Sequence, residues 1–265
     1  MDINNKVVVV TGASFGIGRA IARAASLAGA KVALVARSAG DLADVSGKLG
    51  KDAAAFPGDV SKKADVERVM SEIDARFGRV DVLVNNAARA ITGRIEELHV
   101  EHFHQVMELN VFGALYGMQA AIPRMRLHGG GLIVNVSSGV SKLPHPIPGY
   151  GGYAASKCAM NALSEYARVE LAPDNIRVMT VYPGITATSF RENALVSNEK
   201  WRLPIPAGMT PASPEYVAQR IVQAMREEPD ELRLDPIRKR PRLRNLTSVL
   251  SGLRRAIRLD GTAAR

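Results

Sequence analysis

Short, uniformly apolar runs rich in valine alternate along the chain with longer stretches of helical character. Because these runs are short and almost entirely apolar, they are typical of strands buried on both faces of a parallel sheet. Helices that join parallel strands form right-handed crossovers, so the alternation predicts an α/β fold with a single doubly wound parallel sheet and helices on both faces. The expected strands are 7–10, 32–35, 53–56, 82–84, 132–136 and 178–182, and the expected helices are 17–29, 41–49, 62–77, 97–126, 153–172 and 214–227.

Composition excludes several classes of protein. The 265 residues are 46% apolar and 23% charged, which is ordinary for one globular α/β domain. Cys158 is the only cysteine, so a disulfide framework and a cysteine-clustered zinc or iron–sulfur site are excluded. No apolar run approaches the ~20 residues of a membrane-spanning helix, and the first residues lack the pattern of a signal peptide. We therefore expect a cytoplasmic protein.

The net charge of +9 is concentrated at the C-terminal end of the sequence. Residues 233–265 contain ten of the 35 basic residues and two of the 26 acidic ones, so the remainder is nearly neutral. We therefore divide the chain into a main domain, residues 1–237, and a basic C-terminal extension, residues 238–265. The stretch 233–265 contains no aromatic residue that would stack on bases, which argues against a nucleic-acid partner.

The basic extension has the pattern of an amphipathic helix. Its apolar residues recur at three- and four-residue steps, and most arginines fall on the opposite side. Such a helix either makes a peripheral membrane contact, attracted by anionic lipids, or packs on the main domain or on a second subunit. Gly252 and the short apolar face favour packing, and both alternatives stay open. The apolar residues are Leu246, Val249, Leu250, Leu253 and Ile257.

A glycine-rich loop follows the first expected strand and opens the first expected helix. Its sequence is Thr11-Gly12-Ala13-Ser14-Phe15-Gly16-Ile17-Gly18. Glycines at such a turn let backbone N–H groups approach a pyrophosphate, whose charge the helix N-terminus favours. The spacing G-x-x-x-G-x-G differs from the general dinucleotide fingerprint G-x-G-x-x-G. Its position directly after the first strand nevertheless predicts a nucleotide site.

Further motifs follow the glycine loop in order along the chain. They are Asp59-Val60, Asn85-Asn86-Ala87-Ala88, Asn110, Asn135-Val136-Ser137-Ser138, Tyr153-Ala154-Ala155-Ser156-Lys157, and Pro183-Gly184 followed by Thr188. Together with the glycine loop, these motifs resemble those of the short-chain dehydrogenases/reductases over residues 5–190. The resemblance implies a Rossmann fold, an NAD(P)(H) cofactor and a homodimer or homotetramer. The implied cofactor-binding residues are Thr11, Gly12, Ser14, Phe15, Gly16, Ile17, Gly18, Arg37, Ser38, Asp59, Val60, Asn86, Ala87, Tyr153, Lys157, Pro183, Gly184, Ile185 and Thr188.

The chain departs from the family pattern at three places. Ala88 replaces the glycine of the family's asparagine motif. The stretch from Ser138 to Tyr153 is about two residues longer than usual, and the extra residues fall in a proline-rich loop. Residues 231–236 are expected to form the family's final strand, but the usual Asp-Gly-Gly does not follow.

The expected catalytic residues are Asn110, Ser138, Tyr153 and Lys157. Tyr153 and Lys157 are four residues apart and share one helix face. An ammonium ~5 Å from the phenol would lower the tyrosine pKa, ordinarily about 10, by roughly two units, which brings acid–base chemistry near neutral pH. The resemblance assigns Ser138 to the substrate oxygen and Asn110 to a water that links Lys157 to solvent.

Two neighbours compete for these roles. Tyr150 has Ala154, not a lysine, four residues later, so Tyr153 is preferred. Ser137 competes with Ser138, and the resemblance places Ser138 in the site.

The second expected strand ends in Val35-Ala36-Arg37-Ser38, which favours NADP(H), with NAD(H) as the other option. An acid at this strand end would bond the ribose 2′-hydroxyl of NAD, whereas Arg37 can bind a 2′-phosphate. Asp41 lies one turn beyond this strand end, and the next helix is expected to begin there.

The expected reaction is hydride transfer between nicotinamide and a carbonyl or secondary alcohol of a hydrophobic substrate. Expected substrate contacts are His145, Tyr150, Phe190 and Trp201, the last two in an apolar segment after Thr188. The alternative is a catalytically silent nucleotide-binding sensor or scaffold of the same fold. Several histidines and acids crowd together at 96–104, but His102 and His104 point away from each other on a helix, so we expect no metal site.

Overall fold

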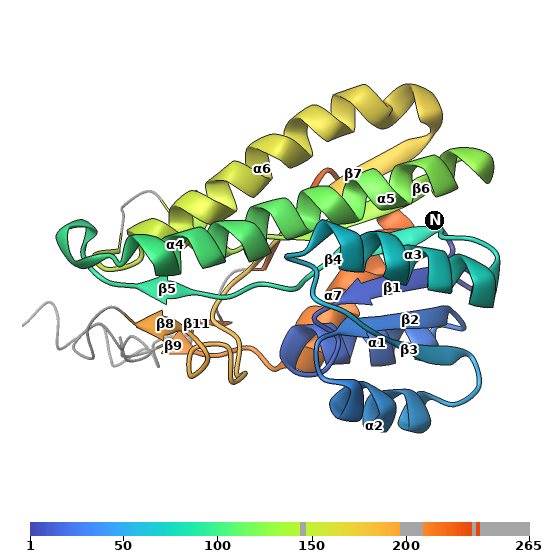
Figure 1. Cartoon of the computed structure of the whole chain (residues 1–265), viewed down its shortest axis with the longest axis horizontal. Coiled ribbons are helices and arrows are strands. Elements are labelled where there is room, and N and C mark those ends of the chain that lie inside the picture. The colour runs from blue at the N-terminus through green and yellow to red at the C-terminus, as the bar shows by residue number, and fades with distance from the viewer. Residues whose placement is uncertain (144–146, 197–208, 235–236, 239–265) are drawn as a thin grey trace, which may run out of the picture.

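The computed structural model describes residues 1–143, 147–196, 209–234 and 237–238 (Figure 1). The predictions for His145, Trp201 and the basic extension beyond Arg238 therefore lie outside the described residues. In the described ranges, seven strands form one parallel sheet in the order β10-β7-β6-β4-β1-β2-β3. These strands are β1 (Val7–Thr11), β2 (Lys31–Ala36), β3 (Ala53–Pro57), β4 (Val82–Asn85), β6 (Gly131–Val136), β7 (Ile176–Pro183) and β10 (Glu231–Leu234).

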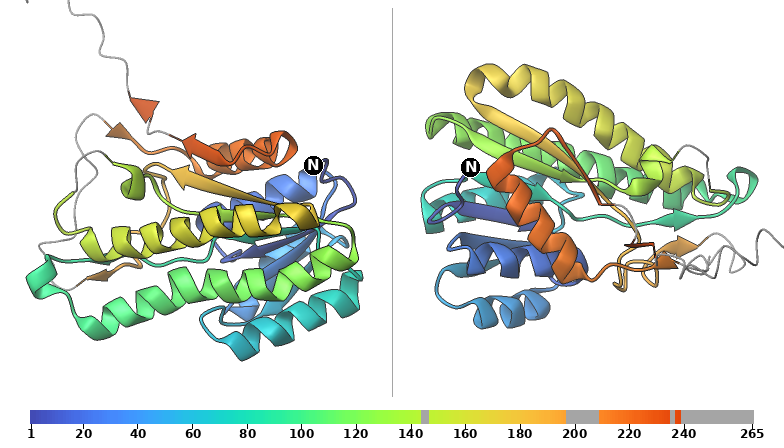
Figure 2. Two further views of the ribbon diagram at one scale, coloured as in Figure 1. Left: turned by 90° about the horizontal axis from the view of Figure 1, so that it is seen from above. Right: turned by 180° about the vertical axis from the view of Figure 1, so that it is seen from behind.

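Helices cover both faces of the sheet, as Figures 1 and 2 show. One face carries α1 (Gly16–Leu27), α2 (Ala39–Leu49) and α7 (Pro214–Glu227). The other carries α3 (Lys63–Phe77), α5 (Gly113–Leu127) and α6 (Gly151–Leu171). Helix α4 (Val100–Met107) runs through a π-helical turn, η2 (Glu108–Phe112), directly into α5. Short 3-10 helices are η1 (Ile95–Glu97), η3 (Gly139–Lys142) and η4 (Ala172–Asp174), and two-residue strands are β5 (Ile91–Thr92), β8 (Leu195–Val196), β9 (Met209–Thr210) and β11 (Ile237–Arg238).

The four valines of β1 show why uniformly apolar runs are needed. Val8 and Val10 belong to the core beneath α1, α2 and α7, whereas Val7 and Val9 belong to the core beneath α3, α5 and α6. All four are at most 1% exposed. Successive side chains of a strand point to opposite faces, so a strand that is covered on both sides is apolar on both faces here.

The strand order reverses between β1 and β4. From β1 the chain builds β2 and β3 on one side, then crosses to build β4, β6, β7 and β10 on the other. Ligands of doubly wound sheets bind where the carboxyl ends of the strands diverge in this way. Thr11 fastens the two strand ends together, because its Oγ1 donates to the Val84 carbonyl at 3.2 Å and accepts from the N–H groups of Asn86 and Ala87 at 3.0 and 3.1 Å.

Helix boundaries differ from the sequence expectations for local reasons. Helix α2 begins at Ala39 because the Ser38 hydroxyl caps it, accepting from the Asp41 N–H at 3.3 Å. Helix α6 begins at Gly151, two residues earlier than predicted, although glycine disfavours helix. A Cβ on Gly152 would lie 3.0 Å from Ile91 and 3.3 Å from Leu98, so tertiary packing requires glycine there.

The helix expected over 97–126 begins instead at Val100 and contains the π-helical turn η2. The strand expected over 231–236 is β10, for the part that is described. In the described part of the chain, no helix has both the length and the apolar character needed to cross a bilayer.

Candidate active site

The glycine loop lies at the carboxyl end of β1 and has the geometry of a phosphate cradle. Gly12 and Gly16 have φ of 65° and 57°, in the left-handed region that favours glycine. A Cβ on Gly18 would lie 2.2 Å from the Gly12 carbonyl oxygen, so only glycine fits. Phe15 is the N-cap residue of α1, and its side chain forms no capping hydrogen bond with the backbone of this helix. The first turn of α1 contains no acidic residue. The uncapped N–H groups can therefore receive an anion.

Two elements frame this cradle. The Asn86 amide donates to the carbonyl of Thr11 at 2.9 Å and to that of Gly12 at 3.3 Å, which holds the loop after β4 against the glycine loop. From the other side, the methyl group of Thr188 lies 3.3 Å from where a Gly16 Cβ would be. The predicted cofactor residues of the glycine loop, the asparagine motif and the segment after β7 therefore meet at one edge of the sheet.

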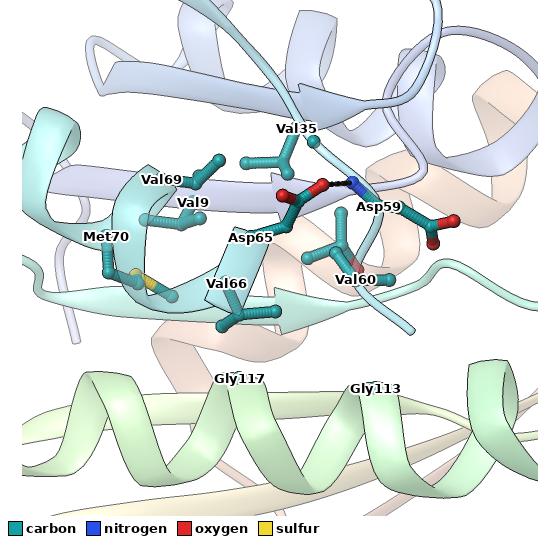
Figure 3. A pocket seen from close by; sticks show the side chains of 12 residues that line it. Val9, Val35, Asp59, Val60, Asp65, Val66, Val69, Met70, Gly113 and Gly117 are labelled. Atoms are coloured by element: carbon teal, nitrogen blue, oxygen red, sulfur yellow. Dashed lines mark hydrogen bonds between the residues drawn. The ribbon is translucent and has the colours of Figure 1, made fainter. Parts of the chain in front are cut away.

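Asp59 follows the end of β3 and is one of the residues that line a small cavity (Figure 3). Its N–H donates to the Asp65 carboxylate at 2.8 Å, and its own Oδ1 accepts from the Ser61 N–H at 3.1 Å and the Ser61 hydroxyl at 2.8 Å. The cavity holds about 10 Å³ and is lined by apolar residues such as Val9, Val60 and Val66. It has room for at most one water, so any adenine recognition by Asp59 must occur outside it.

The end of β2 carries the residues expected to read the cofactor's ribose. Arg37 is exposed, and among the described residues it forms no ion pair. Ser38 caps α2, so its hydroxyl is partly engaged in local structure. Ala36 is half-buried and carries no charge.

Helix α6 carries Tyr153 and Lys157, which are 6% and 2% exposed. Ser138 follows the end of β6, and its hydroxyl forms a side-chain hydrogen bond with Tyr153. The Val140 N–H donates to Ser138 Oγ at 3.3 Å, which leaves the serine hydroxyl proton free to be donated. The competing Ser137 is engaged elsewhere, since its hydroxyl donates to Asn161 Oδ1 at 2.6 Å. Tyr150 is half-buried and lies at the N-cap of α6.

Burial governs the two titratable groups of the site in the chain alone. Burial raises the pKa of the Tyr153 phenol above its ordinary value, and the hydrogen bond from Ser138 partly opposes this. Burial also lowers the pKa of Lys157 to about 7. Lys157 Nζ donates to the Val136 carbonyl at 2.8 Å. The expectation that Lys157 lowers the Tyr153 pKa is therefore wrong for the chain alone, because desolvation exceeds any attraction to the ammonium.

Asn110 lies in the π-helical turn and is 1% exposed. Its Oδ1 accepts from the Arg89 N–H at 2.8 Å, and its Nδ2 donates to the Arg89 carbonyl at 2.9 Å and to Ser156 Oγ at 3.0 Å. The side chain thus joins the loop after β4 to α6 one turn from Tyr153. No pattern in the sequence indicates Arg89 or Ser156 as the partners of Asn110.

An apolar wall surrounds the Tyr153 ring. Phe190 packs on that ring, with 5.7 Å between centroids. The segment that carries Phe190 is fastened by pairing of β8 with β5 and by Arg89 Nε, which donates to the Asn193 carbonyl at 3.0 Å. Other members of the wall are Ala90, Ile91, Leu98, Phe103, Val106, Val140, Tyr150, Ala194 and Leu195.

Comparison with known proteins identifies the family. The model of the short chain dehydrogenase family matches residues 6–199. The chain belongs to this family. A 3-dehydrosphinganine reductase of Danio rerio is 34% identical over 233 residues, which cover 84% of this chain and 69% of that protein.

Two solved structures resemble this short-chain dehydrogenase. One is an alcohol dehydrogenase from the archaeon Thermococcus sibiricus, complexed with 5-hydroxy-NADP, with a TM-score of 0.77 and 33% sequence identity. The matched residues cover 89% of this chain and 98% of that chain. The other is a 3-ketoacyl-(acyl-carrier-protein) reductase from Brucella melitensis, complexed with NADH, with a TM-score of 0.78 and 28% sequence identity. The matched residues cover 88% of this chain and 98% of that chain. This chain is accordingly an oxidoreductase of the short-chain type that uses a nicotinamide cofactor.

The histidine-rich start of α4 gathers no metal site in the ranges that the structure describes. His99 and His102 contact each other through their rings, 5.3 Å apart at the centroids.

Proposed function

We propose that this short-chain dehydrogenase interconverts a carbonyl and a secondary alcohol on a hydrophobic substrate, with Tyr153 as the general acid/base. The observation that carries the proposal is the contact between the Tyr153 phenol and the Ser138 hydroxyl above a buried Lys157. Two hydroxyl groups that converge on one point can bond a single substrate oxygen, where charge develops during the reaction.

The protonation states in the chain alone favour proton donation. A tyrosine with a raised pKa is neutral at physiological pH and can give its proton to a carbonyl oxygen. The Ser138 hydroxyl donates a second hydrogen bond to the same oxygen. A reduced nicotinamide, when bound at the glycine loop, supplies the hydride. Lys157, one helical turn after Tyr153, has a pKa near 7 and can exchange protons at neutral pH.

The apolar wall around Tyr153 supports a hydrophobic substrate. Phe190 packs directly on the Tyr153 ring, and Leu98 and Phe103 belong to the same apolar cluster. The named Danio rerio relative, a 3-dehydrosphinganine reductase, points to the same kind of molecule. We propose a ketone on a long alkyl chain as the substrate class.

A panel of ketones that differ in alkyl length tests this function, with the absorbance of the reduced cofactor as the readout. We expect the specificity constant to rise with chain length, by up to about 0.8 kcal/mol per buried CH₂. Turnover limited to small polar ketones would contradict the substrate class. Cofactor binding without turnover of any ketone or alcohol would favour the alternative, a silent nucleotide sensor or scaffold.

The cofactor preference is proposed to be NADP(H). Arg37 is exposed at the end of β2 beside the uncharged Ala36, so a 2′-phosphate would meet a guanidinium and no acid there. We expect Arg37→Ala to lower the ratio of kcat/KM for NADPH over NADH by about tenfold, the effect of one charge-assisted hydrogen bond worth ~1.5 kcal/mol. Kinetics with both cofactors measure this ratio. Unchanged selectivity would remove Arg37 from the cofactor site.

The assembly and the basic extension remain proposals. We propose a homodimer or homotetramer, in keeping with exposed apolar side chains on α5 and α6 such as Leu127, Tyr166 and Val169. We further propose that residues 238–265 form a separate basic extension. Co-flotation of the full chain with anionic vesicles that is lost at high salt, and lost on deleting 238–265, would support membrane contact. Precipitation of the truncated chain, with no flotation of the intact one, would indicate packing instead.

A further inference from the structure

Helix α6 is joined to the end of strand β6 by a row of polar contacts, and those of Asn161 and Ser164 lie outside the catalytic set. We call this row the α6–β6 seam, and it pairs four residues of the helix with four successive residues at the strand end. The two outermost contacts follow the antiparallel course of α6 and β6, with Ser164 on Asn135 at one end and Tyr153 on Ser138 at the other. The contacts are Ser164 with Asn135, Lys157 with the Val136 carbonyl, Asn161 with Ser137, and Tyr153 with Ser138.

Asn161 holds two points of the turn that carries Ser138. Its Oδ1 accepts from Ser137 Oγ at 2.6 Å, and its Nδ2 donates to Ser141 Oγ at 3.0 Å. Ser141 Oγ in turn donates to the Ser138 carbonyl at 2.8 Å. Asn161 is 7% exposed and Ser137 is 4% exposed, so water has little access to replace these bonds. The backbone on both sides of Ser138 is thereby tied to α6.

The same helix therefore positions both halves of the proposed proton-transfer pair. Tyr153 and Lys157 lie on its buried face, and Asn161 follows one turn later on that face. A shift of the Ser138 turn relative to α6 would separate the two hydroxyl groups that must share one substrate oxygen. Misplacement of a catalytic group by about 1 Å costs up to ~100-fold in rate.

We propose that Asn161 is a positioning residue, which sets the distance between Ser138 and Tyr153 through Ser137 and Ser141. This inference rests on the proposed function of the Tyr153–Ser138 pair. In the described part of the chain, Asn161 forms no hydrogen bond with the hydroxyl group of Ser138 or with that of Tyr153. It acts on catalysis only by way of the turn that it fastens.

The test compares Asn161→Ala with Ser164→Ala at the other end of the seam. Both changes remove a buried hydrogen bond between α6 and β6, so both should lower Tm. We expect kcat of Asn161→Ala to fall at least about tenfold, with the Kd for the cofactor unchanged. The kcat of Ser164→Ala should stay within about twofold of wild type, because Asn135 lies inside the core and keeps its bond from Asn85.

A double-mutant cycle with Ser141→Ala separates positioning from general destabilisation. Asn161 and Ser141 act on the Ser138 carbonyl through one path, so the double variant should lose no more kcat than Asn161→Ala does. The positioning role would be overturned if the double variant lost kcat by the product of the two single losses. It would also be overturned if the kcat losses of Asn161→Ala and Ser164→Ala were in proportion to their losses in Tm. A wild-type enzyme that reduces no ketone would instead overturn the proposed function.

Discussion

Tyr153→Phe should lower kcat about a thousandfold or more, while the Kd for the cofactor changes by less than about threefold. The substitution removes the hydroxyl that is proposed to donate the proton, and general acid catalysis contributes about 100- to 10,000-fold. The phenyl ring keeps the packing against Phe190, so the apolar wall stays intact. Steady-state kinetics and fluorescence titration of the cofactor measure the two quantities.

Tyr150→Phe is the matched control. Tyr150 lies three residues earlier at the N-cap of α6, is half-buried and contributes to the same apolar wall. This variant should retain substantial activity. If Tyr150→Phe were inactive and Tyr153→Phe active, the assignment of the general acid would be wrong.

The pH dependence of stability should change on replacing Lys157 with methionine. Burial lowers the pKa of Lys157 from 10.5 to about 7, so between pH 7 and about pH 10 the unfolded chain binds a proton that the folded chain does not. Stability rises with pH wherever the unfolded state binds more protons. Lys157 therefore lowers the free energy of unfolding at pH 7 relative to its value at pH 9.

Lys157→Met removes this linkage. We compare the free energy of unfolding of wild type with that of the variant at each pH. The difference, wild type minus variant, should rise by about 2 kcal/mol from pH 7 to pH 9. One titrating group contributes ~1.4 kcal/mol per pH unit, and somewhat less near pH 7, where folded Lys157 is half protonated. Urea denaturation at both pH values measures it. Tyr153 titrates at higher pH because burial raises its pKa, and it is common to both proteins. Lys51→Met, in an exposed turn, controls for the lost charge. A difference independent of pH would contradict the lowered pKa.

The sequence was sufficient to predict the main elements because they follow from simple periodicity. The uniformly apolar strands and the glycine loop after β1 correspond to the observed sheet and to the turn into α1. Helical spacing alone placed Tyr153 beside Lys157, whereas Ser138 was expected in the same site only through the family resemblance. The hydrogen bonds and the burial of these residues depend on the packing of α6 against β6, which no local pattern in the sequence reports.

Other features depend on tertiary contacts that no local pattern reports. The strands β5 and β8 have two residues each, too few for any periodicity. The early start of α6 depends on the fit of Gly152 against Ile91 and Leu98. The direction of the Tyr153 pKa was mispredicted because spacing alone indicates that a lysine is near, but not that both groups are removed from water.

The π-helical turn Glu108–Phe112 also limits which changes of length this region tolerates. A π turn closes its hydrogen bond over five residues, as from the Gly113 N–H to the Glu108 carbonyl, and is equivalent to one residue inserted into an α-helix. Deleting one residue there would restore regular α-helix at little local cost. The π turn takes up the extra residue, so α4 and α5 would keep nearly the same phase, and the deletion would mainly redirect the side chains of the turn itself. Asn110 would then leave Arg89 and Ser156, so the insertion is a structural requirement of the site and not a tolerated irregularity.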